Sequence, residues 1–349
     1  MTRFIDVDSL SSLIKVIGIK NFFLGLGDKI REDFLRWNEF EKSARTANHC
    51  NIGVIELMPI SDVNEFGFKY VNGHPGNPKV GLSTVMAFGT FSSMKTGYPL
   101  LVSELTITTA FRTAVMSAIA ASYLVRDDSE RMAIIGCGAQ AEFQILAFYF
   151  FLGIKKVDIY DVDELAMEKL LLNLKDYTEI EITKYSSIKE TVKGCDIVTT
   201  VTADKKWATI LDMDMIESGM HINAVGGDCP GKTELDIEIL KRSSVFVEYE
   251  PQTRIEGEIQ QLSDDFEVTE LWEVISNKRE GRSNKEQITI FDSVGFALED
   301  YSSLRYLFEL SNKFNIGDTI NLIPDLADPK NLFVGIKESY LSETITQAS

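Results

Sequence analysis

The chain reads Met132-Ala-Ile-Ile-Gly-Cys-Gly-Ala-Gln-Ala-Glu-Phe143 at the point that decides its fold. Residues 132–135 are apolar and predict a strand, and a helix is expected to open at Ala141. The turn between them has the pattern Gly136-x-Gly138-x-x-Ala141. In this pattern the first glycine allows a tight turn, the second lets a pyrophosphate approach the backbone, and the alanine permits close helix–strand packing. Because the helix N-terminus would face the phosphates, the stretch predicts a dinucleotide-binding site.

A carboxylate follows the next strand of the chain. Residues 156–160 predict that strand, and it ends in Asp161. An acid at this place holds the ribose 2′-hydroxyl and would repel a 2′-phosphate, so Asp161 favours NAD over NADP. Asp163 is a competing candidate, and a solvated turn residue is the alternative interpretation of Asp161.

The chain after residue 131 alternates apolar strands with helical stretches. The predicted strands are residues 132–135, 157–160, 180–183, 196–201, 220–225, 245–248 and 288–291. This alternation is typical of an open parallel α/β sheet. If the sheet is doubly wound, Thr202, Ser293 and Val294 line the same crevice as the glycine-rich turn, because they follow strands of this set.

The first part of the chain has a different organisation. Residues 1–50 alternate helical stretches with polar joints, and the segments 54–58, 66–71, 83–91 and 99–105 predict strands that lead into a helix over 110–124. The helical block 295–314 is long enough to return the chain to this part. We therefore predict an α/β protein with a Rossmann-type NAD-binding domain (128–314) and a discontinuous α+β substrate-binding and dimerisation domain (1–127 and 315–349).

Composition excludes several classes of protein. At 349 residues, with 44% hydrophobic and 25% charged residues, the chain has the composition of a soluble globular protein with two domains. The formal charge of −18 and the lack of any basic run argue against nucleic-acid binding, which needs clustered lysine and arginine. The longest apolar run, residues 145–154, is too short to cross a bilayer. The scattered cysteines and histidines lack metal-ligand spacing, and reduced thiols fit a cytoplasmic protein.

A second glycine-rich loop carries a single acid near its start. The predicted strand 220–225 runs into Gly226-Gly-Asp228-Cys-Pro-Gly-Lys, and Thr233 is the expected N-cap of a following helix. A carboxylate at the C-terminal end of a strand, on a loop too small to bury anything, indicates a chemical role for Asp228. The alternative interpretation is an Asx-type turn, which an isolated aspartate in such a loop often forms.

Three basic residues stand at unfavourable positions in the first part of the chain. Lys69 lies within a predicted apolar strand, Arg112 falls in the first turn of a predicted helix, and Arg45 ends a helical stretch. Each alone is more often a solvated or salt-bridged group. An arginine at a helix start can, however, share a carboxylate ligand with the free N–H groups there. Glu56, which alternates with Met58 in an apolar strand, could face an ammonium group.

The motifs that contain these residues resemble the ornithine cyclodeaminase/mu-crystallin family, and within it the bacterial ornithine cyclodeaminase branch. The resemblance covers residues 40–300 in the family's order. The motifs are Glu56-Leu-Met-Pro59, Lys69-Tyr-Val-Asn-Gly-His-Pro75, Leu105-Thr-x-x-x-x-x-Arg112-Thr-Ala114, Gly136-Cys-Gly-Ala-Gln-Ala141 and Gly226-Gly-Asp-Cys-Pro-Gly-Lys-Thr-Glu-Leu235. The last motif is the most specific, because general members of the family lack it.

The resemblance implies a homodimer formed through the non-nucleotide domain, tightly held NAD, and conversion of L-ornithine to L-proline and ammonia by hydride transfer to and from that NAD. It implies that Arg45, Lys69 and Arg112 bind the substrate α-carboxylate. It also implies that Glu56 contacts the substrate amines and that Asp228 is the catalytic acid/base. The implied cofactor contacts are Thr84, Gly136, Gly138, Ala139, Gln140, Asp161, Thr202, Val225, Lys232, Ser293 and Val294.

Lys69 has a second possible role. Burial beside Arg45 and Arg112 would lower the pKa of Lys69, so that a neutral Lys69 could assist the first deprotonation of the substrate. Three other functions stay open. They are a lysine cyclodeaminase, an NAD-linked amino-acid dehydrogenase or imine reductase, and a mu-crystallin-like protein that binds NADP and a small ligand without cyclisation.

Overall fold

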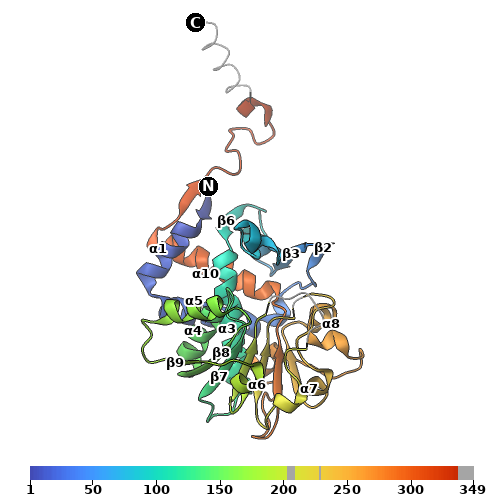
Figure 1. Ribbon diagram of the computed structural model, residues 1–349. Helices are drawn as coiled ribbons and strands as arrows, with labels where there is room; N and C mark the ends of the chain where they lie inside the picture. Colours follow the sequence, from blue (N-terminus) through green and yellow to red (C-terminus); the bar gives the residue numbers. More distant parts are fainter. Residues whose placement is uncertain (203–208, 228, 337–349) are drawn as a thin grey trace.

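A computed structural model describes residues 1–202, 209–227 and 229–336. The described chain forms two β-sheets, one of eight strands and one of seven, with helices packed on both. Figure 1 shows the two sheets in separate halves of the molecule, with β7, β8 and β9 in one half and β2, β3 and β6 in the other.

The eight-stranded sheet has the order β13-β12-β14-β11-β10-β7-β8-β9, and each of its strand pairs is parallel. Its strands are β7 (Arg131–Ile135), β8 (Lys156–Tyr160), β9 (Glu181–Lys184), β10 (Ile197–Thr200), β11 (His221–Ala224), β12 (Ser244–Val247), β13 (Thr269–Glu270) and β14 (Thr289–Asp292). Strands β10, β11 and β14 are buried along their whole length, as in a sheet covered on both faces. The predicted open parallel α/β sheet is confirmed.

Helices connect these strands, and the strand order reverses beside β7. The connecting helices are α4 (Ala141–Leu152), α5 (Glu164–Leu174), α6 (Ile188–Val192), α7 (Ile237–Lys241), α8 (Glu250–Glu256) and α9 (Leu271–Ile275), with the short 3₁₀ turns η3 (Met213–Met215) and η4 (Glu258–Gln261). The chain builds outward from β7 to β8 and β9, then returns to place β10 on the other side of β7. The carboxyl ends of β7 and β10 therefore form the switch point where such sheets bind ligands.

The seven-stranded sheet has the order β15-β1-β6-β5-β4-β3-β2. Its strands are β1 (Thr2–Ile5), β2 (Thr46–Cys50), β3 (Gly53–Ser61), β4 (Glu65–Gly73), β5 (Val85–Ser93), β6 (Pro99–Glu104) and β15 (Asp318–Ile320). The helices of this half are α1 (Val7–Ile17), α2 (Ile19–Leu35), α3 (Thr106–Leu124) and α10 (Ala297–Phe314), with η1 (Trp37–Glu39) and η2 (Asn77–Val80). Strands β2 to β6 pair antiparallel in sequence order, so one long meander forms most of the sheet.

Helix α10 follows β14 and packs on α2 and on strands of the seven-stranded sheet. A strand glycine permits this contact, because a Cβ at Gly67 would lie 3.3 Å from the Tyr301 ring. The chain thus returns to the seven-stranded sheet through α10. The division into one domain of residues 1–127 and 315–349 and another of residues 128–314 stays a prediction.

Two expectations about helix starts are wrong. Helix α3 begins at Thr106 because the Glu104 carboxylate accepts hydrogen bonds from Ile107 N (3.0 Å) and Thr108 N (3.2 Å). Arg112 therefore lies in the second turn of α3, and the first-turn N–H groups of Ile107 and Thr108 already bind Glu104. Helix α7 begins well after Thr233, because its N-cap is Asp236, whose side chain accepts from Glu238 N at 2.8 Å.

Residues 1–50 also differ from the expectation. They include the strands β1 and β2 in addition to the helices, and Arg45 lies in the loop before β2 rather than at a helix end. Both strands are short and carry no long apolar alternation, so pairing with β6 and β3 defines them. Among the described helices, none is by itself long and apolar enough to cross a membrane; only α1 and α2 together have that length and composition, and the two are bent by 101° relative to each other.

Candidate active site

The glycine-rich turn after β7 has room for a pyrophosphate. Gly136 has φ +102°, and a Cβ there would lie 2.9 Å from the Val201 carbonyl oxygen, so no other residue fits between β7 and β10. A Cβ at Gly138 would meet nothing within 4 Å, so the backbone is open on that side. Ala139 and Gln140 follow, and Ala141 is fully buried at the start of α4. These residues fit a dinucleotide phosphate bound at a helix N-terminus.

Asp161 lies directly beside this turn. Its carboxylate accepts hydrogen bonds from Cys137 N at 2.6 Å and from Asp163 N at 2.8 Å. Asp163 has a different use, because its own carboxylate caps α5 by accepting from Leu165 N at 3.0 Å. Of the two acids, Asp161 is therefore the one that adjoins the glycine-rich turn.

Two other predicted cofactor residues contact each other at the end of β10. Lys232 Nζ donates to the Thr202 carbonyl at 3.0 Å, and Thr202 N donates to Glu234 Oε1 at 3.2 Å. The Thr202 hydroxyl also donates to Glu234 Oε1. Val225 N, at the end of β11, donates to Thr200 O at 3.0 Å. Thr84 lies in the other half, in the loop before β5, where its carbonyl accepts from His74 N at 2.9 Å.

The segment 293–295 joins the two halves of the site. On one side the buried Glu248 carboxylate accepts from the Ser293 hydroxyl (2.6 Å), Val294 N (3.4 Å) and Gly295 N (3.2 Å). On the other side Arg45 Nη2 donates to the carbonyl oxygens of Val294 (2.5 Å) and Gly295 (2.8 Å). The backbone after β14 is thus held by charged groups from both sides.

Lys69 lies on β4 and is 1% exposed. Its ammonium group is 2.8 Å from Asp300 Oδ1 and 2.7 Å from Asp300 Oδ2, at the start of α10. Burial lowers the pKa of Lys69 to about 8, with a further lowering from Arg112 and Arg45 that the Asp300 carboxylate opposes. A substantial fraction of Lys69 is therefore neutral in mildly alkaline solution.

Arg112 shares the same carboxylate. Its Nε donates to Asp300 Oδ1 at 3.1 Å and its Nη1 donates to Glu299 Oε2 at 2.9 Å. Gly295 has φ +74°, and a Cβ there would overlap the Arg112 guanidinium, so glycine is needed for this close approach. Burial raises the pKa of Glu299 to about 8.

Arg45 has many protein partners. Its Nη1 lies 3.0 Å from Glu56 Oε2 and its Nε lies 3.0 Å from Glu256 Oε2, in addition to the two carbonyls of segment 293–295. Glu56 and Lys69 point to the same face of the sheet, because Glu56 pairs with Val71 and Met58 pairs with Lys69. The structure therefore brings Arg45, Glu56, Lys69 and Arg112 together. Asp228 lies outside the described residues.

Sequence reasoning did not identify the acids that hold these cations. They are Glu248, Glu256, Glu299 and Asp300, and all four are buried. A signal existed for two of them, since Glu299 and Asp300 are adjacent acids in the first turn of a helix that follows a predicted strand. Glu248 ends the apolar run of β12, a position that also marks a crevice residue.

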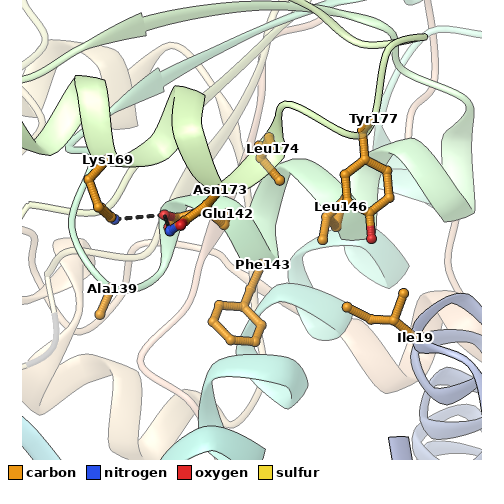
Figure 2. A pocket seen from close by; sticks show the side chains of 9 residues that line it. All are labelled: Ile19, Ala139, Glu142, Phe143, Leu146, Lys169, Asn173, Leu174 and Tyr177. Atoms are coloured by element: carbon orange, nitrogen blue, oxygen red, sulfur yellow. Dashed lines mark hydrogen bonds and ion pairs between the residues drawn. The ribbon is translucent and has the colours of Figure 1, made fainter. Parts of the chain in front are cut away.

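A pocket of about 440 Å³ lies between α4 and α5, beside the glycine-rich turn (Figure 2). Phe143 and Leu146 form part of its apolar wall, and three of its polar residues contact one another. Glu142 Oε1 lies 2.8 Å from Lys169 Nζ and accepts from Asn173 at 2.7 Å, while Lys169 also donates to Gly138 O at 2.9 Å. The pocket wall therefore supports the turn from outside.

This geometry defines a class of protein. A glycine-rich turn at the switch point of a parallel sheet adjoins buried cations supplied by the other half of the molecule, as in nucleotide-dependent enzymes that act on small carboxylates. The chain belongs to the ornithine cyclodeaminase/mu-crystallin family, whose model matches residues 8–314.

Known relatives agree with this assignment. The chain is 52% identical over 330 residues to an ornithine cyclodeaminase of Agrobacterium fabrum, covering 95% of this chain and 93% of that protein. It is similar to an archaeal alanine dehydrogenase dimer with bound NAD, with a TM-score of 0.84, 33% identity and coverage of 92% and 99%. A lysine cyclodeaminase structure shares the fold, with a TM-score of 0.90, 24% identity and coverage of 95% and 98%.

We expect Asp161→Ser to weaken NAD+ binding about tenfold and to narrow the preference over NADP+, because a charged acceptor is lost and a 2′-phosphate is no longer repelled. Titration of each dinucleotide into the protein measures both effects. Asp163→Ser is the matched control, since serine also caps a helix and should leave both affinities unchanged. Equal loss in the two variants would contradict the role of Asp161.

Proposed function

We propose that the protein converts L-ornithine to L-proline and ammonia, with NAD as its cofactor. The observation that carries this proposal is the cluster of Lys69, Arg112 and Asp300 buried beside segment 293–295, at the carboxyl edge of the dinucleotide-binding sheet. Identity of 51–52% to ornithine cyclodeaminases across 95% of the chain supports the same reaction.

The cofactor would lie along the carboxyl ends of the parallel strands. NAD supplies a hydride acceptor and then a hydride donor for the same substrate carbon, so the overall reaction is redox-neutral. We propose that Gly136 and Gly138 admit the pyrophosphate and that Asp161 binds the ribose. The remaining proposed contacts are Thr84, Ala139, Gln140, Thr202, Val225, Lys232, Ser293 and Val294.

Lys69 and Arg112 would bind the substrate α-carboxylate. Within the described residues Arg112 donates through Nε and Nη1 to acids of α10, which leaves Nη2 for a ligand. Arg45 contacts Glu56, Glu256 and two carbonyls, so we propose that it orients Glu56 toward the substrate amines as well as contributing charge. Neutral Lys69 can accept the proton that the α-ammonium group must lose.

Asp228 is the proposed acid/base for the amine that closes the ring. This assignment rests on the family motif around it. Its neighbours Gly226 and Gly227 follow β11 at the same carboxyl edge as Val225 and segment 293–295. A carboxylate carried there could exchange protons with an amine of a substrate bound at that edge.

The proposed reaction is tested by supplying L-ornithine with a catalytic amount of NAD+ and measuring ammonia, proline and NADH together. We expect equal ammonia and proline with no net NADH. NADH formed in an amount equal to the ammonia would instead indicate a dehydrogenase. Faster turnover of L-lysine than of L-ornithine would indicate a lysine cyclodeaminase, whose product has a six-membered ring. Asp228→Asn is the control variant, which should keep NAD+ affinity and lose turnover by at least about 100-fold.

The pH profile tests the role of Lys69. If neutral Lys69 accepts the first proton, kcat/KM should rise with pH through about 8, the pKa of Lys69, and then level off. Asp300 raises the pKa of Lys69, so Asp300→Asn should move this rise to lower pH. The pKa of the free substrate is the same in assays of the natural protein and of Asp300→Asn. If the pH profile of kcat/KM is the same for the two proteins, Lys69 is ruled out as the titrating group.

We also propose a homodimer formed through the outer face of the seven-stranded sheet, the face opposite α10. Leu57, Tyr70 and Phe88 form a cross-strand row there, with Leu57 and Phe88 45% and 46% exposed. Apolar rows of this kind on a sheet face usually mark an interface. The similar alanine dehydrogenase is a dimer.

Because no disulfide links the described cysteines, the proposed location is the reducing cytoplasm.

Phe88→Glu should convert the proposed dimer to a monomer, because it would place a charge within the apolar row. The side chain is half exposed in the single chain, so the monomer should keep its fold. Sedimentation velocity measures the assembly. Leu172→Glu, at a 64% exposed position of α5, is the matched control and should leave the mass unchanged; a dimeric Phe88→Glu protein would place the interface elsewhere.

A further inference from the structure

Three buried acids beneath the cofactor crevice are not used by the proposed chemistry. Asp292 ends β14, Glu258 begins η4, and Glu234 follows the glycine-rich loop after β11. Their relative exposures are 0%, 0% and 2%. Each carboxylate accepts hydrogen bonds from a different piece of backbone, so the three form a series across the edge of the sheet.

The series can be followed from β14 to β10. Asp292 accepts from Glu258 N and Ile259 N, both at 2.9 Å. Glu258 in turn accepts from Glu234 N at 2.7 Å through Oε1 and from Leu235 N at 3.1 Å through Oε2. Glu234 then accepts from the N–H and the hydroxyl of Thr202 through Oε1.

Both glycine-rich turns rest on this series. A Cβ at Gly226 would overlap the Glu234 carboxylate, and one at Gly227 would lie 2.7 Å from Glu258 Oε1. A Cβ at Gly136 would lie 3.2 Å from Thr202 N, the atom that Glu234 holds. The acids therefore contact the Gly226–Gly227 turn that follows β11, and they hold Thr202, which packs against Gly136 of the phosphate turn.

Burying three carboxylates close together destabilises the folded state. Burial raises the pKa of Asp292 to about 7 and the pKa of Glu258 well above its usual value, and neighbouring carboxylates raise both further. Such groups destabilise the fold relative to apolar residues of similar size, so their presence indicates another use.

We propose that Asp292, Glu258 and Glu234 are positioning residues that hold Thr202 and the Gly226–Gly227 turn in place for cofactor binding. The inference rests on the NAD site of the proposed function. It does not require that ornithine be the substrate, because its effect is exerted on the dinucleotide.

The geometry predicts which amide substitutions are tolerated. In Glu258 each oxygen accepts a backbone N–H, so Glu258→Gln would set an amide NH₂ against a donor and should weaken NAD+ binding about tenfold or more. In Glu234 the same oxygen, Oε1, accepts both donors of Thr202, and the carbonyl oxygen of a glutamine can accept these two hydrogen bonds; Glu234→Gln should therefore stay within about threefold of the natural protein, and Glu234→Ala should not.

The experiment titrates NAD+ into each purified variant without substrate and records thermal unfolding alongside. Glu250→Gln is the control, because that acid lies on α8 and pairs with Arg254 near solvent. The expected order of NAD+ affinity is Glu250→Gln and Glu234→Gln close to the natural protein, with Glu258→Gln and Glu234→Ala clearly weaker. Similar affinity in all four variants would overturn the inference.

A double-mutant cycle separates positioning from general stability. In Thr202→Val the hydroxyl donor is absent, so the further loss caused by Glu234→Ala should be smaller than in the natural background. Additive losses would overturn the inference, and this comparison still decides if Glu258→Gln fails to fold. A protein that binds NAD+ with the expected order but leaves ornithine unchanged would refute the proposed reaction alone.

Discussion

One buried carboxylate ties helix α10 to the rest of the seven-stranded half of this molecule. Asp300 binds both Lys69 of β4 and Arg112 of α3, and it lies in the first turn of α10. Removing one partner from such a buried cluster costs about 3–5 kcal/mol, because a charge is left without compensation. The position of α10 on the seven-stranded sheet is therefore coupled to the two cations, and the same helix follows directly from the last strand of the parallel sheet.

This coupling sets the geometry of the proposed reaction. Segment 293–295 links β14 to α10, and charged groups bind it from both sides, Glu248 through its N–H groups and Arg45 through its carbonyls. A substrate held by Lys69 and Arg112 would thus be fixed relative to the edge of the sheet that holds the cofactor. Holding two reacting groups in one orientation is a large part of what an enzyme contributes to such a reaction.

The sequence predicted what depends on local pattern. Strand β7 and its glycine-rich turn could be identified because apolar period, glycines and helix start lie within a dozen residues. The pairing of the cations with their acids could not be predicted, because Lys69 and Asp300 are 231 positions apart and only the packing of α10 brings them together. The start of α3 was missed for a smaller reason, because Glu104 and the threonines after it offer competing caps.

The glycines show the same limit in another form. Gly136 and Gly295 have positive φ, a need that turn-like sequence context suggests. Gly226 and Gly227 are not among the positive-φ glycines of the described chain, and what excludes a side chain there is a carboxylate in the space of the Cβ. Their identity therefore depends on Glu234 and Glu258. A chain that kept this glycine pair without the two acids would have lost the physical reason for it, so glycines and acids form one structural unit beneath the loop that carries Asp228.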